Sequence, residues 1–224
     1  MISLAERLAA TKAAISDECQ RLQRELPTLI VVTKNHPVAL AEELYSLGER
    51  NFGENRVQEA EPKASQLENL NDLNWHLIGQ LQTNKVKQAL TFTDVLHSLD
   101  RESLLAELVK RTSDRENPLD VFIQINLTDD PERGGVETGE LMDFADKVAK
   151  FPSLNLLGIM AVASLETDAR RDFEVVAKLS EKLVADHPSA NQLSIGMSGD
   201  YLEALEFGAT HLRIGTAITG NRQY

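Results

Sequence analysis

The sequence predicts an α/β fold in which eight parallel strands alternate with helices and close into a single (β/α)8 barrel of the TIM type. Short β-branched or apolar runs, typical of buried strands, recur eight times along the 224 residues. Most segments between these runs carry apolar residues at helical spacing. Only about ten residues follow the last strand, so a helix over residues 3–24 is expected to complete the outer ring.

The first elements follow directly from the pattern. The opening helix places its apolar residues on one face: Leu4, Leu8, Ile15, Cys19 and Leu22. Residues 28–33 then form a continuous run of apolar and β-branched residues typical of a buried strand, and Pro37 and Gly48 can start and stop the helix that follows. The remaining strands are expected at residues 51–53, 75–78, 94–97, 120–126, 155–160, 192–195 and 210–214.

Two later segments have clear helical spacing. Their apolar positions are Leu141, Phe144, Ala145 and Val148 in one and Phe173, Val176, Leu179 and Leu183 in the other. No internal repeat, low-complexity tract or Gly/Ser linker interrupts the sequence. We therefore expect a single domain over residues 1–224.

A doubly wound open sheet is the competing fold. Such a sheet more often has five to seven strands and a glycine-rich turn after the first. Residues 33–37, Thr-Lys-Asn-His-Pro, contain no glycine. The strand count and this turn favour the barrel.

Composition restricts the classes of function. No apolar run approaches the ~20 residues that span a bilayer, and the first seven residues do not resemble a secretory signal. Cys19 is the only cysteine, which excludes an internal disulfide and fits a reducing cytoplasm. The formal net charge is −12, with lysine and arginine spread thinly, which argues against binding to nucleic acid. We expect a cytoplasmic monomer.

Barrel active sites lie at the carboxyl ends of the strands. Lys34 follows the first strand, where an amine beside a dry core can act as a Schiff-base nucleophile. A solvated lysine at a strand end is the alternative. Asn55 follows the second strand and offers both a donor and an acceptor, or it caps the next helix.

Two histidines fall on neighbouring strands. His76 lies within the third strand and His97 ends the fourth. They could bind a metal ion together, but no third ligand has suitable spacing. Core histidines with satisfied nitrogens explain them as well, so no metal site is predicted.

The last two loops suggest a phosphate site. Residues 194–200, Ser-Ile-Gly-Met-Ser-Gly-Asp, join a strand to a helix, and residues 213–216, Arg-Ile-Gly-Thr, end the last strand. Glycines and hydroxyls allow close approach to a phosphate, and barrels frequently bind phosphate here. Each segment could also be a turn with its cap. Barrel closure would place Lys34 beside Arg213 and the Gly215–Thr216 turn, within reach of one phosphorylated aldehyde.

Five segments together resemble the pyridoxal phosphate homeostasis proteins, relatives of the alanine racemase N-terminal barrel. They are VVTK at 31–34, FGENRVQE at 52–59, WHLIGQLQTNK at 75–85, LSIGMSGD at 193–200 and LRIGTAI at 212–218. Their order and spacing are shared from the first strand nearly to the C-terminus. Two positions depart from the family pattern: Thr33 stands where serine is frequent, and Thr219 where an aromatic is frequent.

The resemblance implies an alanine racemase N-terminal-domain-like barrel that binds pyridoxal 5′-phosphate. It assigns Lys34 to the Schiff base and Arg213 to the pyridine nitrogen. The phosphate would be held at Ser198, Gly215 and Thr216. The resemblance places the other expected contacts in the pocket wall: Asn55, His76, Ser194 and Met197.

An arginine at the pyridine nitrogen disfavours protonation there and weakens carbanion stabilisation. In alanine racemases a second base is a tyrosine from a further domain of the partner subunit. The barrel is expected to use the whole of this chain, so no residues are expected to remain for such a domain. Tyr45, Tyr201 and Tyr224 match no such motif. We expect a non-enzymatic cofactor carrier in vitamin B6 and amino-acid homeostasis, with pyridoxal phosphate-dependent apoenzymes as candidate recipients. The alternatives are a weak amino-acid racemase and a cofactor-free Schiff-base aldolase in which Lys34 attacks the substrate carbonyl.

Overall fold

The strands of the computed structural model close into a parallel barrel, as predicted. The structure describes residues 2–128, 130, 133–164 and 168–220. The strands follow the order β4-β3-β2-β1-β9-β8-β7-β5-β6, and a β4–β5 pairing closes the ring. Their bounds are β1 Thr28–Val32, β2 Asn51–Glu54, β3 Asn74–Leu77, β4 Val95–Leu99, β5 Leu119–Asn126, β6 Val136–Glu137, β7 Leu154–Ala161, β8 Gln192–Ser194 and β9 His211–Ile214.

One strand was not predicted. β6 has two residues, and within the described ranges it pairs with the end of β5 alone, where Val136 lies opposite Ile125. A pair of residues is too short to show a sequence period, so its pairing depends on tertiary contact. The other eight strands form the barrel wall.

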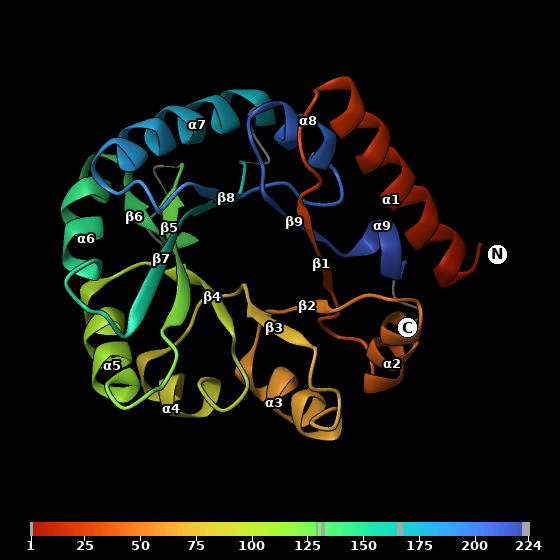
Figure 1. The fold of residues 1–224 in the computed structure, drawn as a ribbon, viewed down its shortest axis with the longest axis horizontal. Helices are drawn as coiled ribbons and strands as arrows, with labels where there is room; N and C mark the ends of the chain where they lie inside the picture. Colours follow the sequence, from red (N-terminus) through yellow and green to blue (C-terminus); the bar gives the residue numbers. More distant parts are fainter. Residues whose placement is uncertain (1, 129, 131–132, 165–167, 221–224) are drawn as a thin grey trace.

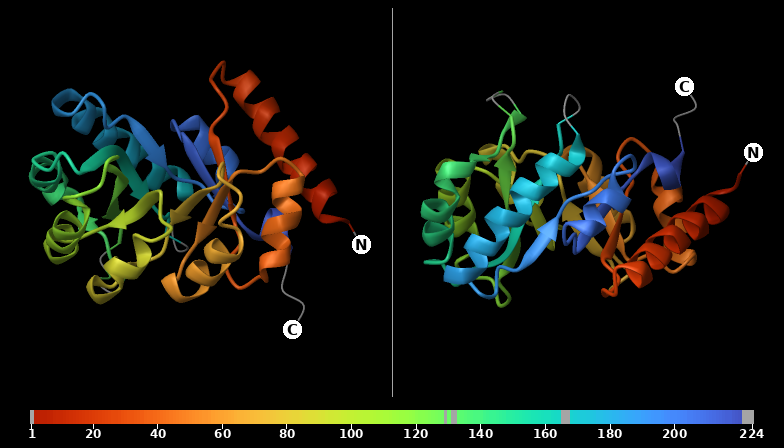
Figure 2. Two further views of the ribbon diagram at one scale, coloured as in Figure 1. Left: turned by 60° about the horizontal axis from the view of Figure 1, so that its bottom comes forward. Right: turned by 90° about the horizontal axis from the view of Figure 1, so that it is seen from above.

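The helices lie outside the ring of strands (Figures 1 and 2). Their bounds are α1 Leu4–Arg21, α2 Val38–Ser46, α3 Val57–Gln66, α4 Val86–Ala89, α5 Glu102–Thr112, α6 Leu141–Val148, α7 Ala169–Asp186, α8 Tyr201–Glu206 and α9 Thr216–Thr219, with 3-10 turns at Thr83–Lys85 and Thr138–Glu140. The four predicted apolar positions of α6 are all buried. Gly48 ends α2 with a φ of +95°, which favours glycine. Among the described residues, no helix is both long and apolar enough to cross a membrane.

Helix α1 completes the outer ring, as expected. Ser3 and Glu6 form a capping box at its start. The helix packs against α8 and α9, and the guanidinium Nε of Arg7 donates to the Ile218 carbonyl at 2.6 Å. These contacts explain how the last strands are covered although only a short helix follows them.

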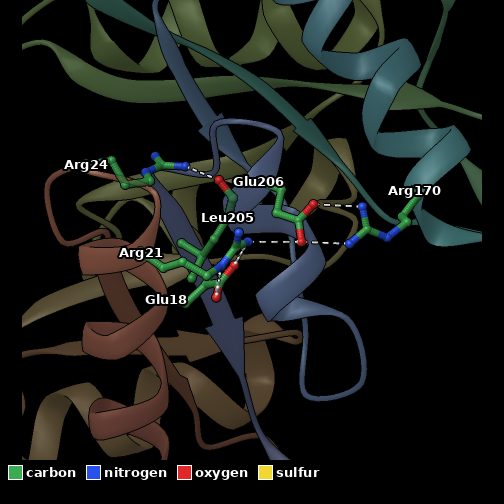
Figure 3. A network of polar contacts seen from close by, with 6 residues as sticks. All are labelled: Glu18, Arg21, Arg24, Arg170, Leu205 and Glu206. Atoms are coloured by element: carbon green, nitrogen blue, oxygen red, sulfur yellow. Dashed lines mark hydrogen bonds and ion pairs between the residues drawn. The ribbon is translucent and has the colours of Figure 1, made fainter.

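Charged side chains tie the end of α1 to the neighbouring helices (Figure 3). Glu206 of α8 accepts from both Arg170 of α7, at 2.7 Å, and Arg21 of α1, at 3.4 Å. Arg24 donates to the Leu205 and Ala209 carbonyls. Exposed ion pairs are each worth little, so the buried face of α1 supplies most of the stabilisation of this seam.

The barrel interior is unusually polar. Interiors of such barrels are dominated by branched aliphatic side chains. Here Phe122 and Met160 share the interior with buried polar side chains, which are His76, His97, Ser194, His211 and Arg213. Buried polar groups are costly unless they are hydrogen-bonded. Their hydrogen bonds therefore organise the inside of the barrel.

Candidate functional site

Lys34 follows the carboxyl end of β1, in a turn that begins at Thr33. β1 ends at Val32, and the backbone N–H of His36 donates to the Thr33 carbonyl at 3.1 Å. The Lys34 side chain is exposed and makes no hydrogen bond or ion pair with any described residue. The amine is thus available at the barrel mouth.

β1 and β9 are neighbours in parallel register, with Ile30 opposite Arg213 and Val31 opposite Ile214. A Cβ added at Gly215 would lie 3.5 Å from the Cβ of Val32. Lys34 and the Gly215–Thr216 turn therefore leave the barrel at the same end of adjacent strands. This is the juxtaposition expected from barrel closure.

The loops after β8 and β9 meet at Ser198. Its Oγ accepts hydrogen bonds from the backbone N–H of Gly215 at 3.2 Å and of Ala217 at 3.3 Å. Thr216, between them, is exposed. These hydroxyl and N–H groups are suited to a phosphate. The Met197 N–H is already used, because it donates to Asp200 at 2.6 Å.

Glycine is required in the first of these loops for packing. Gly196 has a φ of +91°, and a Cβ there would lie 2.7 Å from the Cβ of Ala204 in α8. Gly215 has a negative φ of −107°, and a Cβ would make only ordinary contacts. Packing of the loop itself therefore requires glycine at Gly196, and the close approach of either loop to a phosphate stays a prediction.

Arg213 is buried and held on three sides. Its Nη1 donates to the carbonyl and the Oγ of Ser194 at 2.5 and 2.6 Å, and its Nη2 donates to the Ala161 carbonyl at 2.9 Å. Burial lowers the pKa of Arg213 to about 10, so it remains a cation at neutral pH. Its Nε makes no hydrogen bond with any described residue.

His97 contacts Ser194 in the barrel interior, and His76 contacts His97. The Nδ1 of His97 is 2.8 Å from Ser194 Oγ, its Nε2 is 2.9 Å from His76 Nδ1, and His76 Nε2 is 3.0 Å from Asn51 Oδ1. Both nitrogens of each ring are engaged, which agrees with satisfied core histidines. Within the described part of the chain, no group of three His, Cys, Asp or Glu could hold a metal ion.

Asn55 follows β2 and is half-buried. It lines a cavity of about 500 Å³ together with Gln80 and Lys85. Helix α3 has Arg56 at its N-cap and no side-chain cap, so Asn55 does not cap it. This leaves the Asn55 amide open to a ligand at the mouth.

A buried ion pair behind Lys34 was not predicted. Lys63 of α3 donates from Nζ to Glu54 Oε1 at 2.6 Å and to the Thr33 carbonyl at 2.8 Å. The Thr33 hydroxyl also donates to Glu54 Oε1, at 2.7 Å. The Thr33 carbonyl belongs to the peptide that carries Lys34, so this pair fixes the end of β1. Threonine supplies the hydroxyl that the more frequent serine would supply.

The buried histidines predict how stability depends on pH. Burial lowers the pKa of His76 to about 3 and of His211 to about 4, and it lowers the pKa of His97 well below 6.5. Neighbouring positive charge, including Arg213, adds to the shifts of His97 and His211. The unfolded chain therefore binds protons between about pH 6.5 and 4 that the folded protein does not bind.

These histidines should leave stability unaffected above pH about 6.5 and lower it as the pH falls toward 4. Each contributes about 1.4 kcal/mol per pH unit within this window. Denaturant unfolding at a series of pH values measures how the unfolding free energy changes with pH. Replacing His97 with phenylalanine should lower this slope by the contribution of about one proton. Unfolding free energy that is constant from pH 7 to 4.5 contradicts this account.

Comparison with known proteins first defines the class of barrel. A family model described as alanine racemase, N-terminal domain, matches residues 11–223. An alanine racemase from Corynebacterium glutamicum has a TM-score of 0.71 at 13% identity, covering 98% of this chain and 62% of that one, and shows a common fold.

Within that class, the chain belongs to the family of pyridoxal phosphate homeostasis proteins, which confirms the resemblance read from the sequence. The protein of that name from Escherichia coli K12 is 37% identical over 232 residues, covering all of this chain and 99% of its relative. The one from Aquifex aeolicus is 37% identical and covers 98% of each chain. PipY of Synechococcus elongatus PCC7942, solved with pyridoxal phosphate bound, has a TM-score of 0.86 at 32% identity, covering 96% of this chain and 99% of that one.

Proposed function

We propose that this protein binds pyridoxal 5′-phosphate reversibly as a Schiff base on Lys34 and acts in cytoplasmic vitamin B6 homeostasis. The pairing of β1 with β9 is the observation that carries this proposal. It brings an exposed amine, a fixed buried arginine and a turn rich in backbone donors to one end of the barrel. PipY, whose structure holds pyridoxal phosphate, supports the same cofactor here.

The residues present fit the three functional groups of this cofactor. Ser198, Gly215 and Thr216 would hold the phosphate, for which the backbone N–H groups of Gly215 and Ala217 would exchange their present acceptor, Ser198 Oγ. Arg213 would face the pyridine nitrogen, and Lys34 would add to the aldehyde carbon with loss of one water. Met197 and Asn55 would form the wall, and Ser194 would act by holding Arg213. His76 is buried and reaches Ser194 through His97, so it would act on the cofactor through these side chains.

The arrangement favours binding over turnover. When bound, the cofactor supplies an electron sink whose strength depends on a protonated pyridine nitrogen. Arg213 is held as a cation where that proton would be needed, and the two charges repel. Tyr45 hydrogen-bonds Asp72 before β3, and Tyr201 begins α8, so neither is placed as a second base. Tyr224 lies outside the described residues.

A spectroscopic titration combined with a turnover assay tests this function. Added pyridoxal phosphate should give a visible absorption band that saturates at one cofactor per chain. L-Alanine should then show no repeated conversion to its enantiomer. Many turnovers would favour the racemase instead. A colourless protein with aldol chemistry would favour the cofactor-free aldolase.

We further propose that residues 1–224 act as one cofactor-binding domain and as a monomer that passes the cofactor to dependent apoenzymes. Sedimentation should give the mass of one chain with and without pyridoxal phosphate. Activation of an apoenzyme by the loaded protein, faster than by cofactor that dissociates freely, measures the transfer. A stable dimer, or transfer no faster than dissociation, contradicts these two points.

Replacing Ser198 with alanine should weaken binding through the phosphate. Hydrogen bonds to charged groups contribute about 1.5–3 kcal/mol, so the dissociation constant for pyridoxal phosphate should rise about tenfold or more. Pyridoxal lacks the phosphate and serves as the control ligand, for which the variant and the wild type should bind alike. Equal weakening for both ligands would show that Ser198 acts on the fold instead.

A further inference from the structure

Four polar side chains connect Arg213 to the first residue of β2. Arg213 Nη1 contacts Ser194 Oγ, Ser194 contacts His97, His97 contacts His76, and His76 contacts Asn51. Every member except Asn51 is buried. The residues come from β9, β8, β4, β3 and β2, so the chain of contacts crosses the interior.

The two ends of this chain of contacts set the direction of its hydrogen bonds. The Oδ1 of Asn51 is an acceptor, so His76 carries its proton on Nε2 and donates it there. The Nδ1 of a neutral His76 then accepts from the Nε2–H of His97, whose Nδ1 accepts from the hydroxyl of Ser194. A guanidinium only donates, so Ser194 Oγ accepts from Arg213 with a lone pair that this donation leaves free.

We propose that Asn51, His76, His97 and Ser194 form a positioning relay that fixes the guanidinium of Arg213 for the pyridine end of the bound cofactor. This inference rests on the proposed function and extends it. The four residues are positioning residues, because Arg213 is the one member of this chain of contacts that would touch the cofactor.

The relay makes Ser194 Oγ a stronger hydrogen-bond acceptor for Arg213 and fixes the orientation of its hydroxyl. A hydroxyl that donates its own proton accepts more strongly, because hydrogen bonds in a chain polarise one another. The relay histidines are neutral at physiological pH, so they hold Arg213 without competing with its charge. Without His97, the Ser194 hydroxyl is free to rotate, and Arg213 loses its fixed side-chain acceptor while its hydrogen bonds to the Ser194 and Ala161 carbonyls remain.

The first test needs no cofactor. Nitrogen-15 NMR of the cofactor-free protein should show His76 and His97 as neutral rings, protonated at Nε2, from pH 7.5 down to 5.5. A ring protonated at Nδ1, or a charged ring at pH 7, overturns the relay whether or not the protein binds pyridoxal phosphate.

The second test measures the coupling to the cofactor. His97→Phe and His76→Leu interrupt the relay, whereas His76→Gln keeps one acceptor and one donor and should restore it. His211→Phe is the matched control: His211 is buried beside the same rings, 6.1 Å from His97 between centroids, but bonds to Thr210.

The interrupting variants should bind pyridoxal phosphate about tenfold more weakly, and the visible band should titrate at a different pH. His76→Gln should recover wild-type behaviour, and His211→Phe should change only thermal stability. Wild-type affinity and titration in both interrupting variants would overturn the proposal. If the wild type formed no visible band with pyridoxal phosphate, the proposed function would be refuted, whereas the NMR test of the relay would remain valid.

Discussion

Replacing Lys34 with alanine is expected to abolish the visible absorption band of the protein loaded with pyridoxal phosphate. The exposed Lys34 amine is the group proposed to bond to the aldehyde, so the covalent link is lost. The phosphate contacts at Ser198 and Gly215 remain and should retain some cofactor noncovalently. We expect the dissociation constant to rise about 100-fold, which corresponds to about 2.7 kcal/mol.

The control for this variant is Lys110→Ala. Lys110 is an exposed lysine on α5, outside the candidate site. Its loss removes one lysine and one positive charge without touching the barrel mouth. An unchanged band in Lys34→Ala, or an equal loss in Lys110→Ala, contradicts the role of Lys34.

We expect the largest loss of unfolding free energy on breaking the buried ion pair between Lys63 and Glu54. Substituting Lys63 by methionine leaves a buried Glu54 carboxylate without its partner, and breaking such a pair costs about 3–5 kcal/mol. Among the described residues, Glu54 Oε2 has no hydrogen-bond partner, so the carboxylate would keep only the neutral hydrogen bond from the Thr33 hydroxyl to Oε1. Urea unfolding of the cofactor-free protein measures the change in unfolding free energy.

Two controls separate charge burial from loss of the side chain. The double variant Glu54→Leu, Lys63→Met removes both charges and should recover most of the lost stability. Lys178→Met breaks an exposed pair with Glu174 that has the same N···O distance of 2.6 Å and should leave unfolding unchanged. A double variant as unstable as Lys63→Met would show that packing, and not charge, dominates at this position.

The strands were predictable because a strand that is buried on both faces has a continuous run of apolar residues in the sequence. The expected strands at 120–126 and 155–160 are observed at Leu119–Asn126 and Leu154–Ala161. The two residues of β6 form no such run. Closure of the ring also explains why β1, which precedes Lys34, and β9, which contains Arg213, could be placed side by side from strand order alone.

The polar contacts of the interior could not be predicted in the same way. His97 and Ser194 are 97 residues apart in sequence, and His76 and Asn51 are 25 apart. Their pairing depends on which side chains share an interior layer, which periodicity does not specify. Lys63 lies in a helix of mixed charge, where a lysine typically faces solvent. Only the packing of α3 against β2 shows that it is buried.

Borohydride reduction followed by peptide mapping shows which side chain carries the cofactor. The wild-type protein would be saturated with pyridoxal phosphate, reduced, digested and analysed by mass spectrometry. We expect a single pyridoxyl label, on the peptide that contains Lys34. A label on another lysine, or no label on a protein that has bound the cofactor, would contradict the proposed Schiff base on Lys34.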